Sequence, residues 1–370
     1  MMLDWSDFML QSFSINGYKQ FENLKLDSLA NINFIVGNNN VGKTTILEAL
    51  YTWTCGLNLN FSFPWTVKRH TFIGNPYSLA EGIFSLAKKR DKKLEFSFSG
   101  MDNNQEVTFS HQININSLYL GDGSIDEKFS NLQGGNFTGS SNTNRTIVAK
   151  WNINYTDNLF ANYEISIPEF LNQDISPYKF AGFMDLLAHR VIQQININYS
   201  QIKRKGLLDD VVKRLKEVFP EVESIDMIPY PDGTPAPISV KTFGNDYLPI
   251  YSFGDGFQKW FYIISTTVLY KDAIMCIDEI DATLHPSAQA DFCKTLIQYA
   301  DTYNVQIFAT THNIEFIDRF LAEFNEYKNK HKHYNSRIIT LKKIDSDIRV
   351  RNMSAEEALQ LRDDFGLELR

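Results

Sequence analysis

The chain has 370 residues, of which 43% are hydrophobic and 14% aromatic, so it can bury one large core or two smaller ones. Its 36 Lys and Arg stand against 44 Asp and Glu, and the net charge of −8 excludes a broadly basic nucleic-acid-binding protein. The three cysteines form no CxxC pair, which excludes a zinc ribbon. MMLDWSDFML lacks the basic region of a signal peptide, and no apolar run approaches the ~20 residues that span a bilayer. We therefore expect a cytoplasmic protein with no membrane partner.

A glycine-rich loop lies between a predicted strand and a predicted helix near the start of the chain. Residues 37–44 are GNNNVGKT and match the pattern GxxxxGK[ST]. INFIV at 32–36 is short and β-branched, as in a buried strand, and TTILEALYTW at 44–53 has apolar residues at helical spacing. An asparagine-rich turn is the alternative interpretation, but both flanks favour a phosphate-binding loop.

The residue types in this loop suit the chemistry of binding a nucleoside triphosphate. Glycines allow successive backbone N–H groups to point at phosphate oxygens, and the helix after the loop adds its positive dipole end. Lys43 would contact the β- and γ-phosphates as a catalytic residue, and the hydroxyl of Thr44 would hold Mg²⁺. The predicted ATP-binding residues of the loop are Gly37, Asn38, Asn39, Asn40, Val41, Gly42, Lys43, Thr44 and Thr45.

The middle of the chain changes from strand-like to helix-like patterns. Between residues 60 and 170, runs such as KLEFSFSG and EVTFSHQININ alternate polar and apolar residues, which predicts antiparallel strands. Residues 121–144 are rich in Gly, Ser and Asn and predict a long loop. Residues 176–222 carry one apolar face at helical spacing opposite lysines and arginines, which predicts a helical lobe.

An acidic strand end far downstream would complete the phosphate site. AIMCIDEID at 273–281 is an apolar run that ends in acids, typical of a parallel strand whose carboxyl end reaches an active site. We predict that Asp278 binds Mg²⁺ and that Glu279 orients and deprotonates the attacking water. A core strand ending in a solvated acidic turn is the alternative. The 235 residues between Lys43 and Asp278 (278 − 43) point to the ATP-binding-cassette (ABC) type of ATPase.

Two further stretches fit an ABC-type ATPase. VQIFATTH at 305–312 predicts another buried strand, and His312 at its end would sense the γ-phosphate. YSFGDGFQKW at 251–260 predicts a glycine-rich turn that opens a helix, where a second anion site would form. A second phosphate site is useful if two copies pair head to tail around two ATP molecules. Its predicted residues are Ser252, Gly254 and Gly256.

These motifs together resemble the ABC ATPases of the RecF, OLD and structural-maintenance-of-chromosomes group, and most closely the AAA-annotated ATPases of prokaryotic antiviral systems. The opening SFSINGYKQFENLKLDSLANINFIVGNNNVGKTTILEAL and the segment DEIDATLHP at 278–286 carry the resemblance. It implies an α/β P-loop NTPase fold of the ABC type, with a mostly parallel core sheet, an antiparallel β subdomain and a helical lobe. It also implies ATP and Mg²⁺ as cofactors, a head-to-tail homo-oligomer and a separately encoded effector such as a nuclease or toxin.

The resemblance also predicts how the chain is divided. We expect residues 1–175 to form the first part of the ATPase head, 176–245 the helical lobe and 246–370 the second part of the head. The chain departs from the group's pattern at Asp255, which would place a negative charge near a γ-phosphate and so weaken stimulation of hydrolysis across a dimer. The group's usual glutamine-loop residue has three candidates, Gln105, Gln112 and Gln133.

Three other functions can be weighed against an ATP-dependent switch. A RecF-like DNA-repair ATPase would need a local basic surface, for which KRK at 203–205 and KNKHKH at 328–333 are candidates, although solvated helix faces are the simpler interpretation. A nuclease within this chain is rejected, because only 23 residues come after the Asp-x-Asp that ends at Asp347 (370 − 347). A transporter ATPase fits the opening motif and the large β insertion less well.

Overall fold

The computed structural model describes residues 9–59, 62, 82–83, 85–88, 93–119, 146–155, 159–166, 176–230, 232, 237–345 and 347–365. Contacts divide the chain into two compact units. Unit 1 comprises Met1–Leu10, Asp27–Leu47 and Phe180–Arg370, and unit 2 comprises Gln11–Leu26 and Glu48–Lys179. The loop expected at 121–144, with Gln133, lies outside the described residues.

Unit 1 is built on a six-stranded sheet with the order β15-β14-β3-β13-β12-β8. Its strands from β14 to β8 run parallel, and only β15 is antiparallel to its neighbour. Every residue of β3, β12 and β13 is buried, as required of parallel strands covered on both faces. The strands are β3 (Ile32–Gly37), β8 (Ala181–Met184), β12 (Ile274–Ile277), β13 (Gln306–Thr310), β14 (Ser336–Ile344) and β15 (Asp347–Ser354). The mostly parallel core sheet expected from the sequence is confirmed.

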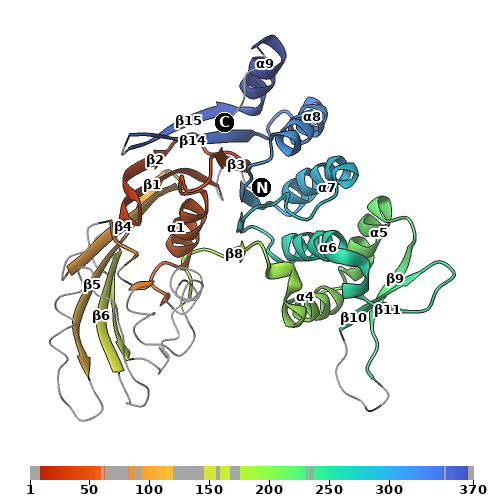
Figure 1. Ribbon diagram of the computed structural model, residues 1–370, viewed down its shortest axis with the longest axis horizontal. Coiled ribbons are helices and arrows are strands. Elements are labelled where there is room, and N and C mark those ends of the chain that lie inside the picture. The colour runs from red at the N-terminus through yellow and green to blue at the C-terminus, as the bar shows by residue number, and fades with distance from the viewer. Residues whose placement is uncertain are drawn as a thin grey trace. The chain divides into compact units, whose positions relative to one another are not determined.

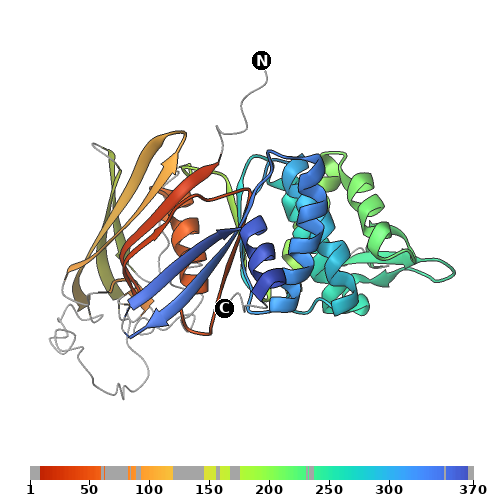
Figure 2. The same cartoon turned by 90° about the horizontal axis from the view of Figure 1, so that it is seen from above.

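Three long helices lie side by side against this sheet (Figures 1 and 2). Phe34 of β3 packs on Phe316 and Phe320 of α8, with ring centroids 6.0 and 4.5 Å away, so aromatic contacts fix α8 on the strand that leads into the phosphate loop. The helices are α6 (Gly254–Leu269), α7 (Gln289–Thr302) and α8 (Ile314–Lys330), with a single turn, η6 (Pro286–Ala288), before α7.

The helical lobe of unit 1 precedes α6 and carries a small antiparallel sheet of order β11-β10-β9. Its elements are η4 (Ala188–Arg190), α4 (Ile192–Arg204), α5 (Leu208–Val218), β9 (Val222–Met227), β10 (Ile238–Thr242), β11 (Leu248–Pro249) and η5 (Ile250–Phe253). The expectation of helix over 176–222 is wrong at β8. That short run forms a strand because it pairs with β12, with Ala181 opposite Ile274.

Unit 2 is a second six-stranded sheet, of order β2-β1-β4-β5-β6-β7. Its strands are β1 (Leu10–Tyr18), β2 (Phe21–Leu26), β4 (Lys93–Asp102), β5 (Gln105–Tyr119), β6 (Thr146–Tyr155) and β7 (Leu159–Ser166). The successive pairs from β4 to β7 are antiparallel, as the alternating sequence predicts. Helix α1 (Lys43–Cys55) begins in unit 1 and continues into unit 2, where the buried indole N–H of Trp53 donates to the carbonyl of Val107 at 2.9 Å.

The last described helix, α9 (Ala355–Phe365), begins with a reciprocal cap. The backbone N–H of Glu357 donates to the Ser354 hydroxyl at 3.1 Å, and the backbone N–H of Ser354 donates to the Glu357 carboxylate at 2.7 Å. This reciprocal pair of hydrogen bonds is a capping box, which satisfies two of the N–H groups at the start of the helix. Among the described residues, none of the helices has the length and apolar character needed to cross a membrane.

Candidate nucleotide-binding site

The order of the core sheet brings three sequence motifs to one edge. Strands β3, β13 and β12 are parallel neighbours, with Ile307 opposite Ile32 and Ile274 opposite Gln306. Their carboxyl ends therefore meet at the same edge, which is where ligands bind in open α/β sheets. The glycine-rich loop comes after β3, the acids come after β12, and His312 comes after β13.

The loop between β3 and α1 has the backbone of a phosphate cradle. Gly37, Asn40 and Gly42 have φ angles of 142°, 62° and 97°, which turn the chain as successive inward N–H groups require. A Cβ at Gly37 would lie 2.4 Å from the carbonyl oxygen of Leu341 in β14, so this position accepts only glycine. Asn38 and Asn39 are exposed on the loop, as is Asn40, whereas Val41 is buried and anchors it.

Lys43 begins α1 and turns its amine back over this loop. Its Nζ donates to the carbonyl oxygens of Gly37 and Asn38, both at 2.9 Å. Burial lowers the pKa of Lys43, and the nearby carboxylates of Glu279 and Asp278 oppose that shift. Because both hydrogen bonds of the ammonium to the described part of the chain are to neutral carbonyls, it can exchange them for phosphate oxygens.

The hydroxyl and the carboxylate expected to hold a metal are in direct contact. The hydroxyl of Thr44 donates to Asp278 at 2.9 Å, and Asp278 itself is buried. No group of three or more His, Cys, Asp or Glu side chains is arranged to hold a metal within the described part of the chain. A metal at this edge would thus have few protein ligands, which suits Mg²⁺, since that ion keeps waters and phosphate oxygens around it. Thr44 and Asp278 would hold it, and it would neutralise charge on the β- and γ-phosphates.

Glu279 lies in a tight turn immediately after the acidic strand. Its φ of 47° is left-handed, and its backbone N–H donates to the hydroxyl of Thr310 at 2.8 Å. The same Thr310 hydroxyl donates to Asp278 at 2.7 Å, so one buried side chain fixes both acids. One residue farther along the chain from β13, the hydroxyl of Thr311 donates to Asp281 at 2.5 Å. His312 comes next and is exposed, as a sensor of a bound phosphate would need to be.

The glycine-rich turn before α6 forms a separate exposed surface within unit 1. Ser252 and Gly254 are both exposed, and Gly254 has a φ of +77° with open space where a side chain would stand. Gly256 faces inward instead, because a Cβ there would lie 3.1 Å from the carbonyl oxygen of Thr283. The turn therefore presents a serine, a glycine and a helix N-terminus to solvent.

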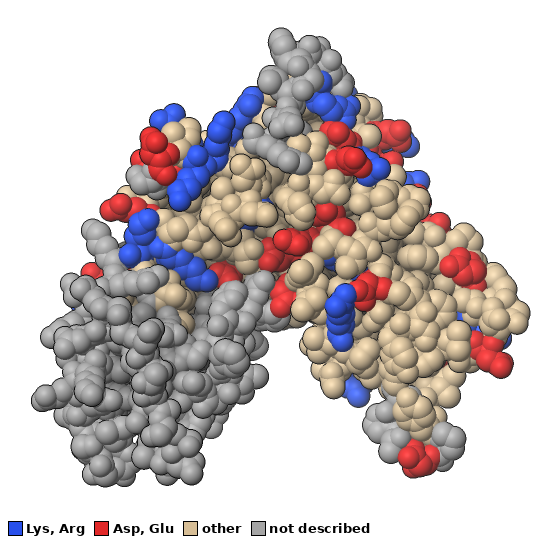
Figure 3. Space-filling view, in the orientation of Figure 1, with Lys and Arg blue, Asp and Glu red and all other residues tan. Residues whose placement is uncertain are grey.

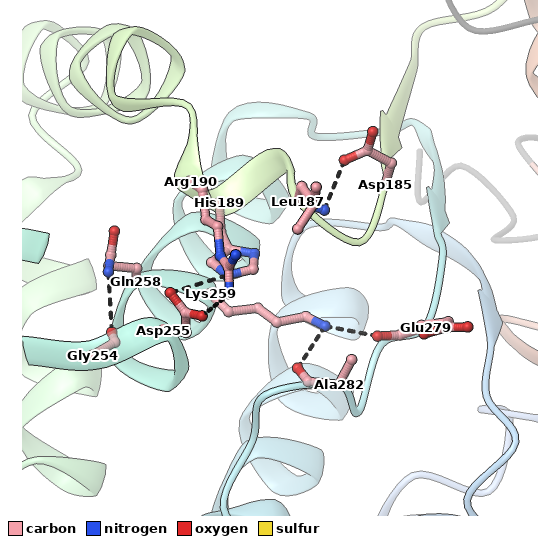
Figure 4. Close-up of polar contacts among 10 residues, drawn as sticks. All are labelled: Asp185, Leu187, His189, Arg190, Gly254, Asp255, Gln258, Lys259, Glu279 and Ala282. Atoms are coloured by element: carbon pink, nitrogen blue, oxygen red, sulfur yellow. Dashed lines mark hydrogen bonds and ion pairs between the residues drawn. The ribbon is translucent and has the colours of Figure 1, made fainter. Parts of the chain in front are cut away.

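Asp255, the residue that departs from the group's pattern, has a cationic partner. Its carboxylate forms an ion pair with Arg190 of η4, and the buried Nε2 of His189 lies 3.9 Å from its other oxygen (Figure 4). Burial, and then the charge of Lys259, lowers the pKa of His189 to about 4, so its imidazole is neutral at pH 7. The negative charge at this turn is therefore compensated by Arg190.

Several residues of this site could not be identified from the sequence. Thr310 and Thr311 stand in the motif VQIFATTH but carry no signal beyond their place before His312. Arg190 lies 65 residues before Asp255 and Lys259 lies in an apolar helix, so only the fold brings them to the site. Of the glutamine-loop candidates, Gln105 and Gln112 both lie in β5 of unit 2.

Comparison with known families identifies the chain. The family model described as AAA domain, putative AbiEii toxin, Type IV TA system matches residues 32–318, from β3 into α8. The chain belongs to this family. It is therefore an ATPase of the AAA type, and its fold implies an ATP site. An ATP/GTP phosphatase of Helicobacter pylori is 25% identical over 337 residues, covering 84% of this chain and 87% of the relative. An uncharacterized protein of Methanocaldococcus jannaschii is 26% identical over 225 residues, covering 59% and 90%.

Solved structures show the fold. The structure of an Smc head bound to the C-winged helix domain of ScpA superposes with a TM-score of 0.51 at 17% identity, covering 95% of this chain and 99% of that one. A second Smc head, with an extended coiled coil and bound to the C-terminal domain of ScpA derived from Pyrococcus furiosus, gives 0.50 at 13% identity, with 97% and 99% covered. The predicted ABC-type P-loop fold is confirmed.

Proposed function

We propose that the chain is an ATP-dependent switch in which two copies pair head to tail around two ATP molecules. The Thr44–Asp278–Thr310 hydrogen-bond chain supports the hydrolytic part of this proposal, because it joins the two predicted Mg²⁺ ligands to the turn of Glu279. Each ATP would lie between the Lys43 loop of one copy and the Ser252 turn of the other. Glu279 would accept a proton from the attacking water, and Lys43 would stabilise charge on the phosphates.

The hydrolytic part of the proposal is tested with Glu279→Gln. Glutamine keeps the shape of the side chain but cannot accept the proton, so we expect ATP turnover to fall by at least about 100-fold while ATP binding persists. A trapped ATP-bound dimer should then form, which light scattering with and without ATP and Mg²⁺ would detect. If the variant hydrolyses ATP at the parental rate, Glu279 is not the base. If neither protein changes mass with ATP, the head-to-tail pairing is wrong.

We also propose that the switch controls a separately encoded effector in an antiviral defence system. The family description, which names a putative toxin of a toxin–antitoxin system, and the resemblance of the motifs to antiviral ATPases support this role. The test is phage challenge of cells that express the chain with the product of its neighbouring open reading frame. Protection should be lost with Lys43→Ala. Equal protection by the parent and the variant would contradict an ATP-controlled effector.

A RecF-like ATPase that binds DNA is the second candidate, and one surface favours it. In each of the two candidate basic clusters the first lysine is paired with an acid, Lys203 with Asp226 and Lys328 with Glu356. The hairpin β14–β15 differs. Lys342 lies directly opposite Arg349, and Arg351 shares their face. Like charges opposite each other destabilise a sheet unless an anion lies between them. In Figure 3, a row of Lys and Arg lies at the upper left, where Figure 1 labels β14 and β15.

This second candidate is tested by DNA binding at several salt concentrations, with and without ATP. Each lysine or arginine that contacts a phosphate adds to the negative slope of affinity against salt. Replacing Lys342, Arg349 and Arg351 with glutamine should flatten that slope by about 2 to 3 in log–log units if all three contact phosphates. The matched control is glutamine at Lys203 and Lys328. DNA binding whose affinity depends on neither salt nor ATP would contradict a RecF-like function.

A further inference from the structure

A buried lysine of α6 contacts the turn that carries Glu279. Lys259 is only 3% exposed, and its Nζ donates to the carbonyl oxygens of Glu279 at 2.7 Å and Ala282 at 2.8 Å (Figure 4). The Glu279 carboxylate points away from the amine in Figure 4, so Lys259 contacts the backbone of that residue rather than its reacting group. A buried ammonium is expensive unless it is paired and hydrogen-bonded, which makes this placement unusual for a merely space-filling residue.

The turn that Lys259 contacts is strained and is held on its other side by β13 and the residue after it. Glu279 and Thr283 both have left-handed backbones, with φ angles of 47° and 68°. Non-glycine residues adopt that conformation at a cost, and it persists only where the surroundings determine it. Thr310 binds the backbone N–H of Glu279 and Thr311 binds the side chain of Asp281. Lys259 binds the carbonyl oxygens, so the turn is held between two elements.

The charges around Lys259 favour an ammonium next to the Glu279 turn. Burial lowers the pKa of Lys259 to about 8, while Asp281, Glu279 and Asp278 all raise it. The amine is therefore protonated at pH 7, and its charge offsets a group of three neighbouring acids. The first turn of the same helix also touches this segment, because Gly256 lies against the carbonyl oxygen of Thr283.

We propose that Lys259 is a positioning residue that fixes the backbone of the Glu279 turn and links it to the glycine-rich turn at the start of α6. This role rests on the proposed function, in which Glu279 is the base and the turn at Ser252 receives a phosphate from a second copy. Lys259 lies four residues after Asp255 on the same helix, so a shift of α6 on contact with that phosphate moves the amine and with it the turn. The catalytic residue itself remains Glu279.

The test is Lys259→Met, which keeps the length of the buried stem but removes the N–H donors and the charge. Single-turnover ATP hydrolysis should slow by about tenfold or more, whereas the affinity for ATP should stay within about twofold. The same substitution in a Glu279→Gln background should have little additional effect, because Lys259 acts only through that carboxylate. Lys271→Met, at an exposed position just after α6, is the matched control and should behave as the parent.

Hydrogen exchange gives a readout that does not depend on hydrolysis. In Lys259→Met, amides of residues 279–285 should exchange faster, while those of β13 should exchange at the parental rate. Unchanged exchange in the turn would overturn the proposal, and so would an equal loss of turnover in the parental and Glu279→Gln backgrounds. Failure of the proposed function has a different signature. The parent would then hydrolyse ATP no faster than Glu279→Gln, while Lys259→Met would still loosen the turn.

Discussion

Two glycine-rich turns open helices in unit 1, and they have opposite electrostatics. The loop before α1 places the ammonium of Lys43 over carbonyl oxygens, beside the buried carboxylate of Asp278. The turn before α6 is exposed and keeps the carboxylate of Asp255 paired with Arg190. The hydrogen bonds of Lys43 are to neutral acceptors, so the loop before α1 can bind a phosphate without breaking an ion pair. At the turn before α6, the Asp255–Arg190 ion pair must break before Arg190 can contact a phosphate.

The difference suggests an order of events. A nucleotide would occupy the loop of Lys43 in a single copy, since every group there belongs to one chain. In the proposed dimer, the turn of Ser252 would contact a phosphate only when a second copy presents its nucleotide. If this order holds, substitutions in the Lys43 loop should abolish every effect of nucleotide. Substitutions in the Ser252 turn should affect only the association of two copies and the steps that require a dimer.

Lys43→Ala tests the first turn and should have the largest effect. Removing one partner of a charge pair of this kind costs about 2–5 kcal/mol, which corresponds to a loss of ATP affinity of about 30-fold to a few thousand-fold. Fluorescent-nucleotide titration would measure it, and thermal unfolding without nucleotide should be unchanged within a few degrees. Lys271→Ala, an exposed lysine of the same unit, is the control. ATP affinity equal to that of the parent would show that the loop is not the nucleotide site.

Ser252→Arg tests the second turn. Ser252 is exposed, so arginine should fold without strain but would add bulk and charge where the partner's phosphate docks. We expect ATP-dependent association to be lost and ATP affinity of the single copy to change by less than about threefold, since the Lys43 loop is untouched. Gln201→Arg, on the exposed side of α4, adds the same group elsewhere. If Ser252→Arg still dimerises with ATP in light scattering, the Ser252 turn does not contact a partner's nucleotide.

Thr310→Val tests whether β13 positions Asp278 and Glu279 beside the Lys43 loop. Valine has the shape of threonine, but it removes the buried hydroxyl that accepts from the Glu279 N–H and donates to Asp278. The loss of a buried hydrogen bond costs about 1–3 kcal/mol, and if about 1.4 kcal/mol of that is lost from the transition state, turnover should fall by about tenfold. Thr267→Val is the control, because its buried hydroxyl donates only to the carbonyl of Ile263 within α6. Parental turnover in Thr310→Val would mean that β13 does not position the acids.

The first turn could be predicted from the sequence and the second only in part. The loop at 37–44 is local, since its strand, glycines, lysine and helix are contiguous, and the structure has them as expected. The acidic strand was equally clear because its apolar run is continuous. The state of Asp255 could not be predicted, because its partner Arg190 comes from η4, in a different part of the chain. The strand β8 was missed for a similar reason, since only pairing with β12 makes it a strand.

Asp255→Asn should have the smallest effect, and its direction matters more than its size. Asparagine is nearly isosteric, and it removes the charge that occupies Arg190. The pair is exposed, so its loss costs about 0.2–1 kcal/mol at most, and thermal stability should hardly change. ATP-dependent association should become about two- to fivefold tighter, because the partner's phosphates no longer meet a carboxylate or compete with it for Arg190.

Arg190→Gln in the same assay should shift association the other way, because it removes the cation and leaves Asp255 uncompensated at the turn. The double substitution separates two explanations. If Arg190 contacts the incoming phosphate, Asp255→Asn should give no gain once Arg190 is replaced, apart from relief of simple repulsion, which high salt would remove. If the gain is the same with or without Arg190, the ion pair only neutralises a charge, and the second turn binds phosphate through Ser252, Gly254 and the helix N-terminus alone.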